Sequence, residues 1–179
     1  MSRTVEILEE AKSALNGLGR LLTATEWELV GESLRRDRMW EGLLAGGGPR
    51  LVKPDLIQAL GIYGGRRGIW VDKARTGDLS EDGLGITVGL YASEGAYPDL
   101  LEGAEGAYRY PETQIPSWDL ASVNATKAAA ELGIDVFIIT CSAAEPTLRS
   151  VRPARVSGWD DDASEFTIVI NEMADLVRS

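Results

Sequence analysis

Aromatic side chains, glycines and cations are concentrated between Gly61 and Pro111 of this 179-residue chain. Glycine lets the backbone turn tightly or approach a ligand closely, and an aromatic ring beside such a turn offers a stacking surface. Arginine and lysine nearby can hold phosphates. A protein that takes a planar base out of a nucleic acid needs these components together. The aromatic residues of the segment are Tyr63, Trp70, Tyr91, Tyr97, Tyr108 and Tyr110.

The same composition also fits a small β-barrel with tight turns, whose tyrosines only pack in the core. Composition by itself favours this structural explanation. The cations add information because they are grouped along the chain. One group lies inside the segment and comprises Arg66, Arg67, Lys73 and Arg75; the other two are Arg35, Arg36 and Arg38, and Arg149, Arg152 and Arg155.

Charge and residue usage exclude several classes of protein. The net charge of -10 and the pI of about 4.6 argue against a nonspecific nucleic-acid binder, because neutralised phosphates supply most of that affinity. The chain has no histidine, so Ser-His pairs, Cys-His pairs and histidine metal sites are excluded. Its one cysteine, Cys141, cannot form an internal disulfide, and its apolar neighbours predict a buried thiol.

The hydropathy pattern is that of an ordinary globular protein, with 44% hydrophobic residues. No stretch is apolar enough to span a membrane, and the N-terminus is too charged for a signal peptide, so we expect a cytoplasmic protein without a membrane partner. We expect no metal and no cofactor. The acidic run at residues 160–162 is better explained as a solvated turn than as a metal site.

Helical spacing of apolar residues predicts an N-terminal helical segment over residues 1–55. Thr23, with Glu26 three residues later, has the pattern of a capping box. Trp27, Val30 and Leu34 are expected to form the packing face of the helix that follows. The predicted helices cover residues 4–15, 23–36 with a continuation to 44, 54–60 and 117–132.

From Gly61 onward the apolar period changes to one typical of strands. The predicted strands cover residues 68–72, 85–92, 107–110, 134–141, 148–159 and 166–170, and a polar loop joins the first two. Ser117 is the expected N-cap of the helix at 117–132, Gly133 its end, and Leu120 and Val123 its core-facing residues. The fold class is therefore α+β: a small β-barrel domain over residues 56–179 with flanking helices.

Short motifs in this domain resemble a known family. Gly61-Ile62-Tyr63-Gly64 resembles the Gly-Ile-His-Gly opening of the SRA (SET-and-RING-associated) domain, a PUA-like β-barrel that reads modified cytosine by flipping the base out of DNA. Gly95-Ala96-Tyr97-Pro98-Asp99 is similar to its Gly-Gly-Tyr motif with following acidic residues. Tyr108-Arg109-Tyr110 lies where the family has a second tyrosine.

A closer resemblance covers residues 56–170. The segments GIYGGRRGIWVDKARTG, TVGL, YRYPET and ATKAAAELGIDVFII are similar to the SRA-like domain that precedes the His-Asn-His (HNH) nuclease domain of actinobacterial modification-dependent restriction endonucleases. This resemblance implies a DNA reader that is not itself an enzyme. It implies a nuclease domain in cis in the parent protein, absent from these residues. The lack of histidine fits both a chain cut before that domain and a stand-alone reader.

The family places a flipped base between two tyrosines. The resemblance therefore assigns stacking to Tyr97 and to either Tyr108 or Tyr110, and adds Tyr63 and Trp70 to the predicted pocket. Stacking is worth about 1 to 3 kcal/mol per base, which offsets the few kcal/mol needed to unpair it. The alternative for each tyrosine is core packing, and for Trp70 it is closure of the barrel.

An acidic side chain accepts a hydrogen bond from the cytosine amino group in the family. The resemblance assigns this role to Asp99, although the acidic run that follows the tyrosine is shorter here than in the family. Glu102 and Asp72 are alternatives. Asp99 also fits an ordinary turn after a proline.

The cations of the same segment are the predicted phosphate contacts, with solvated loop charge as the alternative. The arginines at 35, 36 and 38 either extend this DNA surface or only support the barrel. The predicted phosphate-binding residues are Arg66, Arg67, Lys73, Arg75 and Lys127.

The leading interpretation is a reader of double-stranded DNA that contains 5-methylcytosine or 5-hydroxymethylcytosine, working by base flipping, with a homodimer left open. The alternative is a PUA-like module that binds a small molecule or a peptide and no DNA. A third is an enzyme whose Asp72, Asp99 and Glu102 converge on one cleft. Strongly salt-dependent DNA affinity would favour the first.

Overall fold

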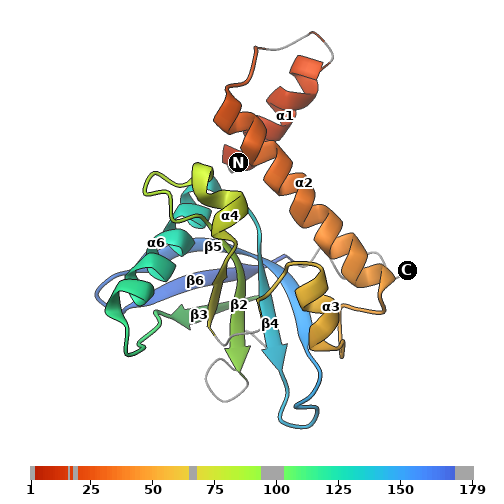
Figure 1. Cartoon of the computed structure of the whole chain (residues 1–179), viewed down its shortest axis with the longest axis vertical. Coiled ribbons are helices and arrows are strands. Elements are labelled where there is room, and N and C mark those ends of the chain that lie inside the picture. Colours follow the sequence, from red (N-terminus) through yellow and green to blue (C-terminus); the bar gives the residue numbers. More distant parts are fainter. Residues whose placement is uncertain (1–2, 16, 18–19, 65–67, 94–102, 172–179) are drawn as a thin grey trace.

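The computed structural model describes residues 3–15, 17, 20–64, 68–93 and 103–171 (Figure 1). The chain is an α+β protein, as predicted, in which two N-terminal helices project from one end of a six-stranded mixed sheet. Within these residues no helix is both long and apolar enough to cross a lipid bilayer.

The two N-terminal helices are α1 (Arg3–Leu15) and α2 (Ala24–Ala45). The capping box is confirmed: the Thr23 side chain accepts a bond from the Glu26 N–H at 3.2 Å, and Glu26 accepts one from the Thr23 N–H at 2.9 Å. Helix α2 runs without a break through Arg36, because nothing before Gly46 interrupts its hydrogen bonding.

The predicted packing face of α2 is only partly right. Val30 is buried with Leu29 against α1, but Trp27 and Leu34 are 39% and 46% exposed. The buried side of the C-terminal half follows Arg36 and Met39 instead, because that half lies against the sheet.

The six strands lie close to their predicted positions, in the spatial order β1-β2-β4-β5-β6-β3. Strands β2 and β4 are parallel, and the other neighbours are antiparallel. Their bounds are β1 Ile69–Val71, β2 Thr87–Ser93, β3 Glu105–Arg109, β4 Val136–Cys141, β5 Ser150–Asp160 and β6 Glu165–Ile170.

Alternation along β4 separates the core into two layers. Val136 and Ile138 point to one side, where α1, the start of α2 and α6 (Pro116–Leu132) pack. Phe137 and Ile139 point to the other, where the end of α2 and α3 (Pro54–Ala59) pack. We call these sides the α6 face and the α3 face.

The predicted closed barrel is replaced by an open, curled sheet in the part of the chain that the structure describes. Strand β1 has three residues and pairs with β2 alone, and β3 pairs with β6 alone, so the ladder stops at both edges. The sheet nevertheless curls around the α6 face. Strands β3 and β2 come close enough that the Tyr108 hydroxyl donates a 3.1 Å hydrogen bond to the Tyr91 carbonyl.

Two local predictions need correction. Ile115, rather than Ser117, is the N-cap of α6, and no side chain caps the helix, whose first residue is Pro116. Gly133 ends the helix in the left-handed region, as predicted. Leu120 is 62% exposed because the buried side of α6 passes through Ala125 and Ala129. The predicted polar loop between β1 and β2 contains a short helix α4 (Lys73–Thr76) and a 3-10 turn η1 (Gly77–Leu79).

Candidate nucleic-acid interface

The motif at residues 61–64 crosses the sheet where side chains leave room for it. Gly61 follows α3 with a φ of 76°, and its turn directs Ile62 and Tyr63 onto the α3 face. There the Ile62 carbonyl lies over Gly89 of β2, where a Cβ would come within 2.5 Å of that oxygen. Gly89 therefore allows Tyr63 to lie against the sheet.

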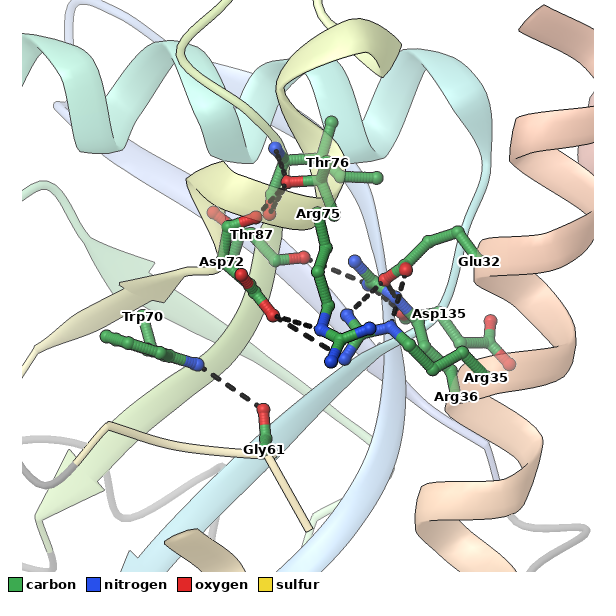
Figure 2. A network of polar contacts seen from close by, with 11 residues as sticks. Glu32, Arg35, Arg36, Gly61, Trp70, Asp72, Arg75, Thr76, Thr87 and Asp135 are labelled. Atoms are coloured by element: carbon green, nitrogen blue, oxygen red, sulfur yellow. Dashed lines mark hydrogen bonds and ion pairs between the residues drawn. The ribbon is translucent and has the colours of Figure 1, made fainter. Parts of the chain in front are cut away.

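Trp70 of β1 packs on the same motif. Its indole N–H donates to the Gly61 carbonyl at 3.3 Å (Figure 2), and its ring covers Gly64 so closely that a Cβ there would lie 2.3 Å from the ring. The ring is half-buried. Trp70 thus packs β1 onto the segment that follows α3 and does not close a barrel in the described part of the chain.

Two tyrosines and an arginine extend this group along β2. The Tyr63 and Tyr91 rings are 5.9 Å apart between centroids and inclined by 31°. The Arg149 guanidinium lies 5.7 Å from the Tyr91 ring and donates to the Pro146 carbonyl at 2.8 Å, which orients it. We call Tyr63, Trp70, Tyr91 and Arg149 the aromatic cluster.

Cations gather beside Trp70 at the end of β1. Asp72 is the N-cap of α4, which carries Lys73 and Arg75 in its single turn. The Asp72 carboxylate lies 3.6 Å from Arg75 and 3.6 Å from Arg35 of α2 (Figure 2). The side chain of Arg75 is 67% exposed. The structure thus brings the predicted phosphate ligand Arg75 together with Arg35, and Lys73 is exposed in the same turn.

Arg36, the next residue of α2, is directed into the sheet. It is 3% exposed, pairs with Glu32 at 2.8 Å, and donates to the carbonyl of Thr87 at 2.9 Å and to that of Asp135 (Figure 2). Burial alone would raise the pKa of Glu32, but the hydrogen bonds and charges of Arg35 and Arg36 hold it below its ordinary value. Of the two sequence alternatives, Arg36 supports the fold.

Tyr108 and Tyr110 lie on the other side of the sheet. Both pack with the core of the α6 face, as expected for residues two apart on a strand. Tyr108 is 3% exposed. The Tyr110 ring lies 4.5 Å from that of Phe166, and its hydroxyl donates to Asp161 at 2.9 Å.

Lys127 also lies on this side, where its charge is already paired. Its ammonium pairs with Asp161 at 2.6 Å and lies 5.8 Å from the Tyr110 ring and 5.4 Å from the Trp159 ring. The described partners of Lys127 are thus Asp161, Tyr110 and Trp159, and none of them belongs to the aromatic cluster.

The four described residues of the predicted base pocket thus occupy two faces. Tyr63 and Trp70 meet on the α3 face, whereas Tyr108 and Tyr110 pack on the α6 face. The remaining predictions lie outside the described residues, and these are Tyr97, Asp99, Glu102, Arg66 and Arg67.

Within the aromatic cluster, Tyr91 carried no assigned role in the sequence, and Arg149 belonged to a cation group that was only a weaker candidate for the DNA surface. Side chains alternate along the predicted strand at 85–92, so Tyr91 points to the other face of the sheet from Leu90. This alternation is the sequence signal for the position of Tyr91. Arg149 had no such signal, because its contact with Tyr91 is made across the sheet.

The acidic run at residues 160–162 and Cys141 were the other two features singled out in the sequence. Among the described residues no group of three or more Cys, Asp or Glu side chains is placed to hold a metal ion. Asp160 accepts bonds from the N–H groups of Asp162 and Ala163, which is the turn predicted for the acidic run. Cys141 is half-buried rather than fully buried, and Arg149 donates to its sulfur at 3.2 Å.

No protein-family model matches this chain, and no curated protein matches it. Among solved structures, it is similar to a chain described as "Modification dependent TagI restriction endonuclease", with a TM-score of 0.43 and 16% sequence identity. The match covers 70% of this chain and 49% of the other, so the chain spans about half the length of that protein.

Proposed function

We propose that this chain binds double-stranded DNA containing modified cytosine, with the aromatic cluster and the cations of α4 forming part of the contact surface. The motif resemblance in the sequence motivates the DNA partner. The observation that supports it most is the position of the half-buried rings of Trp70 and Tyr91 beside exposed cations in a protein of net charge -10. Tyr63 is 8% exposed and packs with Tyr91 from the core of the α3 face.

Each part of this group suits one component of a nucleic acid. Arg75 lies beside Arg35 at Asp72, and Lys73 is exposed at the start of the same turn, so each cation suits a separate phosphate contact. Aromatic rings suit the flat face of an unstacked base. The local positive charge allows affinity without a basic protein, because only the contacting surface must neutralise phosphates.

The finer proposal is a reader of 5-methylcytosine or 5-hydroxymethylcytosine that flips the base, without catalysis of its own. Tyr97 and Asp99 remain the residues proposed for stacking and for the base edge. Tyr108 and Tyr110 are less suited to stacking than expected, because one is 3% exposed and the other is bonded to Asp161. Recruitment of a nuclease domain in cis belongs to the same proposal.

The test is an anisotropy titration with duplexes that differ only in cytosine or 5-methylcytosine. We expect tighter binding of the methylated duplex, loss of that preference in Tyr97→Ala, and weaker binding of both duplexes in the double variant Lys73→Ala/Arg75→Ala. Trp118→Ala is the control, since Trp118 is a 60% exposed aromatic residue on α6.

Flipping itself is measured with 2-aminopurine placed next to the modified base, whose fluorescence should rise on binding. Absence of binding to either duplex at low salt would contradict the proposal and favour the PUA-like module that binds a small molecule or a peptide. Equal affinity for both duplexes would support DNA binding and contradict recognition of the modified cytosine.

A further inference from the structure

Helix α2 carries a second feature, which is independent of the proposed DNA contacts. Trp27, Gly31, Leu34 and Arg38 are spaced alternately by four, three and four residues, so at 100° per residue they lie within about 60° of one another. All four are exposed. They lie opposite the buried side that includes Leu29 and Arg36, and we call them the α2 stripe.

The contacts of the described residues do not explain a glycine at position 31. A Cβ at this position would meet no described atom within 4 Å, and the residue is helical. Glycine inside a helix costs roughly 0.5 to 1 kcal/mol relative to alanine. A glycine flanked on one helix face by Trp27 and Leu34 is, however, suited to close approach of another helix.

The charged residues beside the stripe favour a second copy of α2 as the helix that packs on it. Glu28 and Arg38 are exposed, one near each end of the stripe. Two other acidic residues of the helix are already paired: Glu26 with Arg20, and Glu32 with Arg35 and Arg36. Antiparallel pairing of α2 with a second α2 brings the Glu28 end of one helix to the Arg38 end of the other.

We propose that the α2 stripe is the contact surface of a symmetric dimer, with a second copy of this chain as its partner. In the antiparallel register, Leu34 of one copy fills the space over Gly31 of the second. Arg38 of one copy then covers the Trp27 ring of the second and reaches its Glu28. Because the pair is twofold symmetric, each of these contacts occurs twice.

The geometry of the chain leaves this surface accessible. Helix α2 projects from the sheet, and α1 packs beside its N-terminal half (Figure 1). That contact uses Leu29 and Val30, which leaves Trp27 and Leu34 exposed. The stripe covers about three helical turns, so we expect a weak, concentration-dependent dimer rather than an obligate one.

The test is sedimentation equilibrium on the full chain from about 1 to 500 µM, the range suited to small interfaces. The average mass should rise from 19.3 kDa towards twice that value. Glu28→Arg alone or Arg38→Glu alone should weaken the dimer about tenfold or more, because like charges then face each other twice. Arg109→Glu, the same charge change at an exposed site on β3, should have no effect.

Mixing the two single variants gives the decisive result. Arginine then stands at both positions 28 and 38 of one variant, and glutamate at both positions of the other. Their heterodimer pairs opposite charges at both contacts and should bind much more tightly than either variant binds itself. Circular dichroism confirms that both variants are folded. A chain that stays monomeric at 500 µM, or folded variants that do not associate when mixed, would overturn the proposal.

Discussion

The hydroxyl of Tyr108 on β3 donates a hydrogen bond to the carbonyl oxygen of Tyr91 on β2, although β4, β5 and β6 separate the two strands in the sheet. The 3.1 Å distance requires the sheet to curl, so that its far strands approach each other across the α6 face. The side chain of Tyr91 points to the other face, into the aromatic cluster. One strand therefore links the curl of the sheet to the proposed DNA contacts.

Tyr108→Phe removes this hydrogen bond and keeps the ring. We expect a loss of about 1 kcal/mol in the free energy of unfolding, because one buried acceptor loses its donor. Tyr108→Ala should cost about 3 to 5 kcal/mol, since it also leaves a cavity in the core. Urea unfolding measures both. A Tyr108→Phe variant as stable as the unchanged chain would show that the hydroxyl contributes nothing to the curled sheet.

Glu32→Gln removes the anion that compensates Arg36. Since Arg36 is buried, we expect a loss of about 3 to 5 kcal/mol in stability at neutral pH. Glu41→Gln, on the exposed side of the same helix, is the matched control and should change little.

The pH dependence of that loss has a definite sign. The pKa of Glu32 is lowered in the folded chain, so its ionised form stabilises the fold above the unfolded pKa. The difference between the unchanged chain and Glu32→Gln should therefore shrink as the pH falls below about 4.5. A difference that stays constant over this range would contradict the ionised pair.

Lys73→Ala/Arg75→Ala tests the proposed phosphate binding through salt. If both residues neutralise phosphates, the slope of log affinity against log salt should fall by about 1.8, roughly 0.9 for each cation removed. The affinity for methylated and unmethylated duplexes should fall by the same factor, because phosphates carry no sequence information. An unchanged slope would place the DNA surface elsewhere.

Gly64→Ala tests the packing of Trp70 on the turn. The added Cβ would lie 2.3 Å from the ring, so the ring or the backbone must move, at a cost of about 1 to 3 kcal/mol. Trp70 fluorescence should shift as well. Gly158→Ala is the control because no described atom lies within 4 Å of its Cβ position, and it should leave both stability and emission nearly unchanged.

The Tyr110 hydroxyl should ionise at a higher pH than that of an ordinary tyrosine. Burial and the hydrogen bond to Asp161 raise its pKa to about 12. Its neutral form therefore stabilises the fold below the ordinary tyrosine pKa of 10.0, and this contribution is lost as the pH rises towards 12. In an alkaline absorbance titration, Tyr110→Phe should remove the tyrosine that ionises near pH 12. Loss of a tyrosine that ionises near pH 10 would contradict the bond to Asp161.

Local signals determined the secondary structure. The capping box at Thr23 and the left-handed end at Gly133 act within a few residues, and both were predicted correctly. Runs of apolar and aromatic residues bounded by turn signals predicted the six strands of the described residues. The short helix α4 was missed, since its single turn is too brief to show helical periodicity.

The α+β class, the order of the elements, the lack of histidine chemistry and the grouping of cations near β1 can all be read from the order of the residues. The packing of the folded chain was needed to learn which aromatic residues are buried, whether the sheet closes, and that Arg35 faces Asp72 while Arg36 enters the core. This division follows from the range of the interactions. Caps and periodicity are local, whereas the burial of Arg36 depends on a carbonyl 51 residues away.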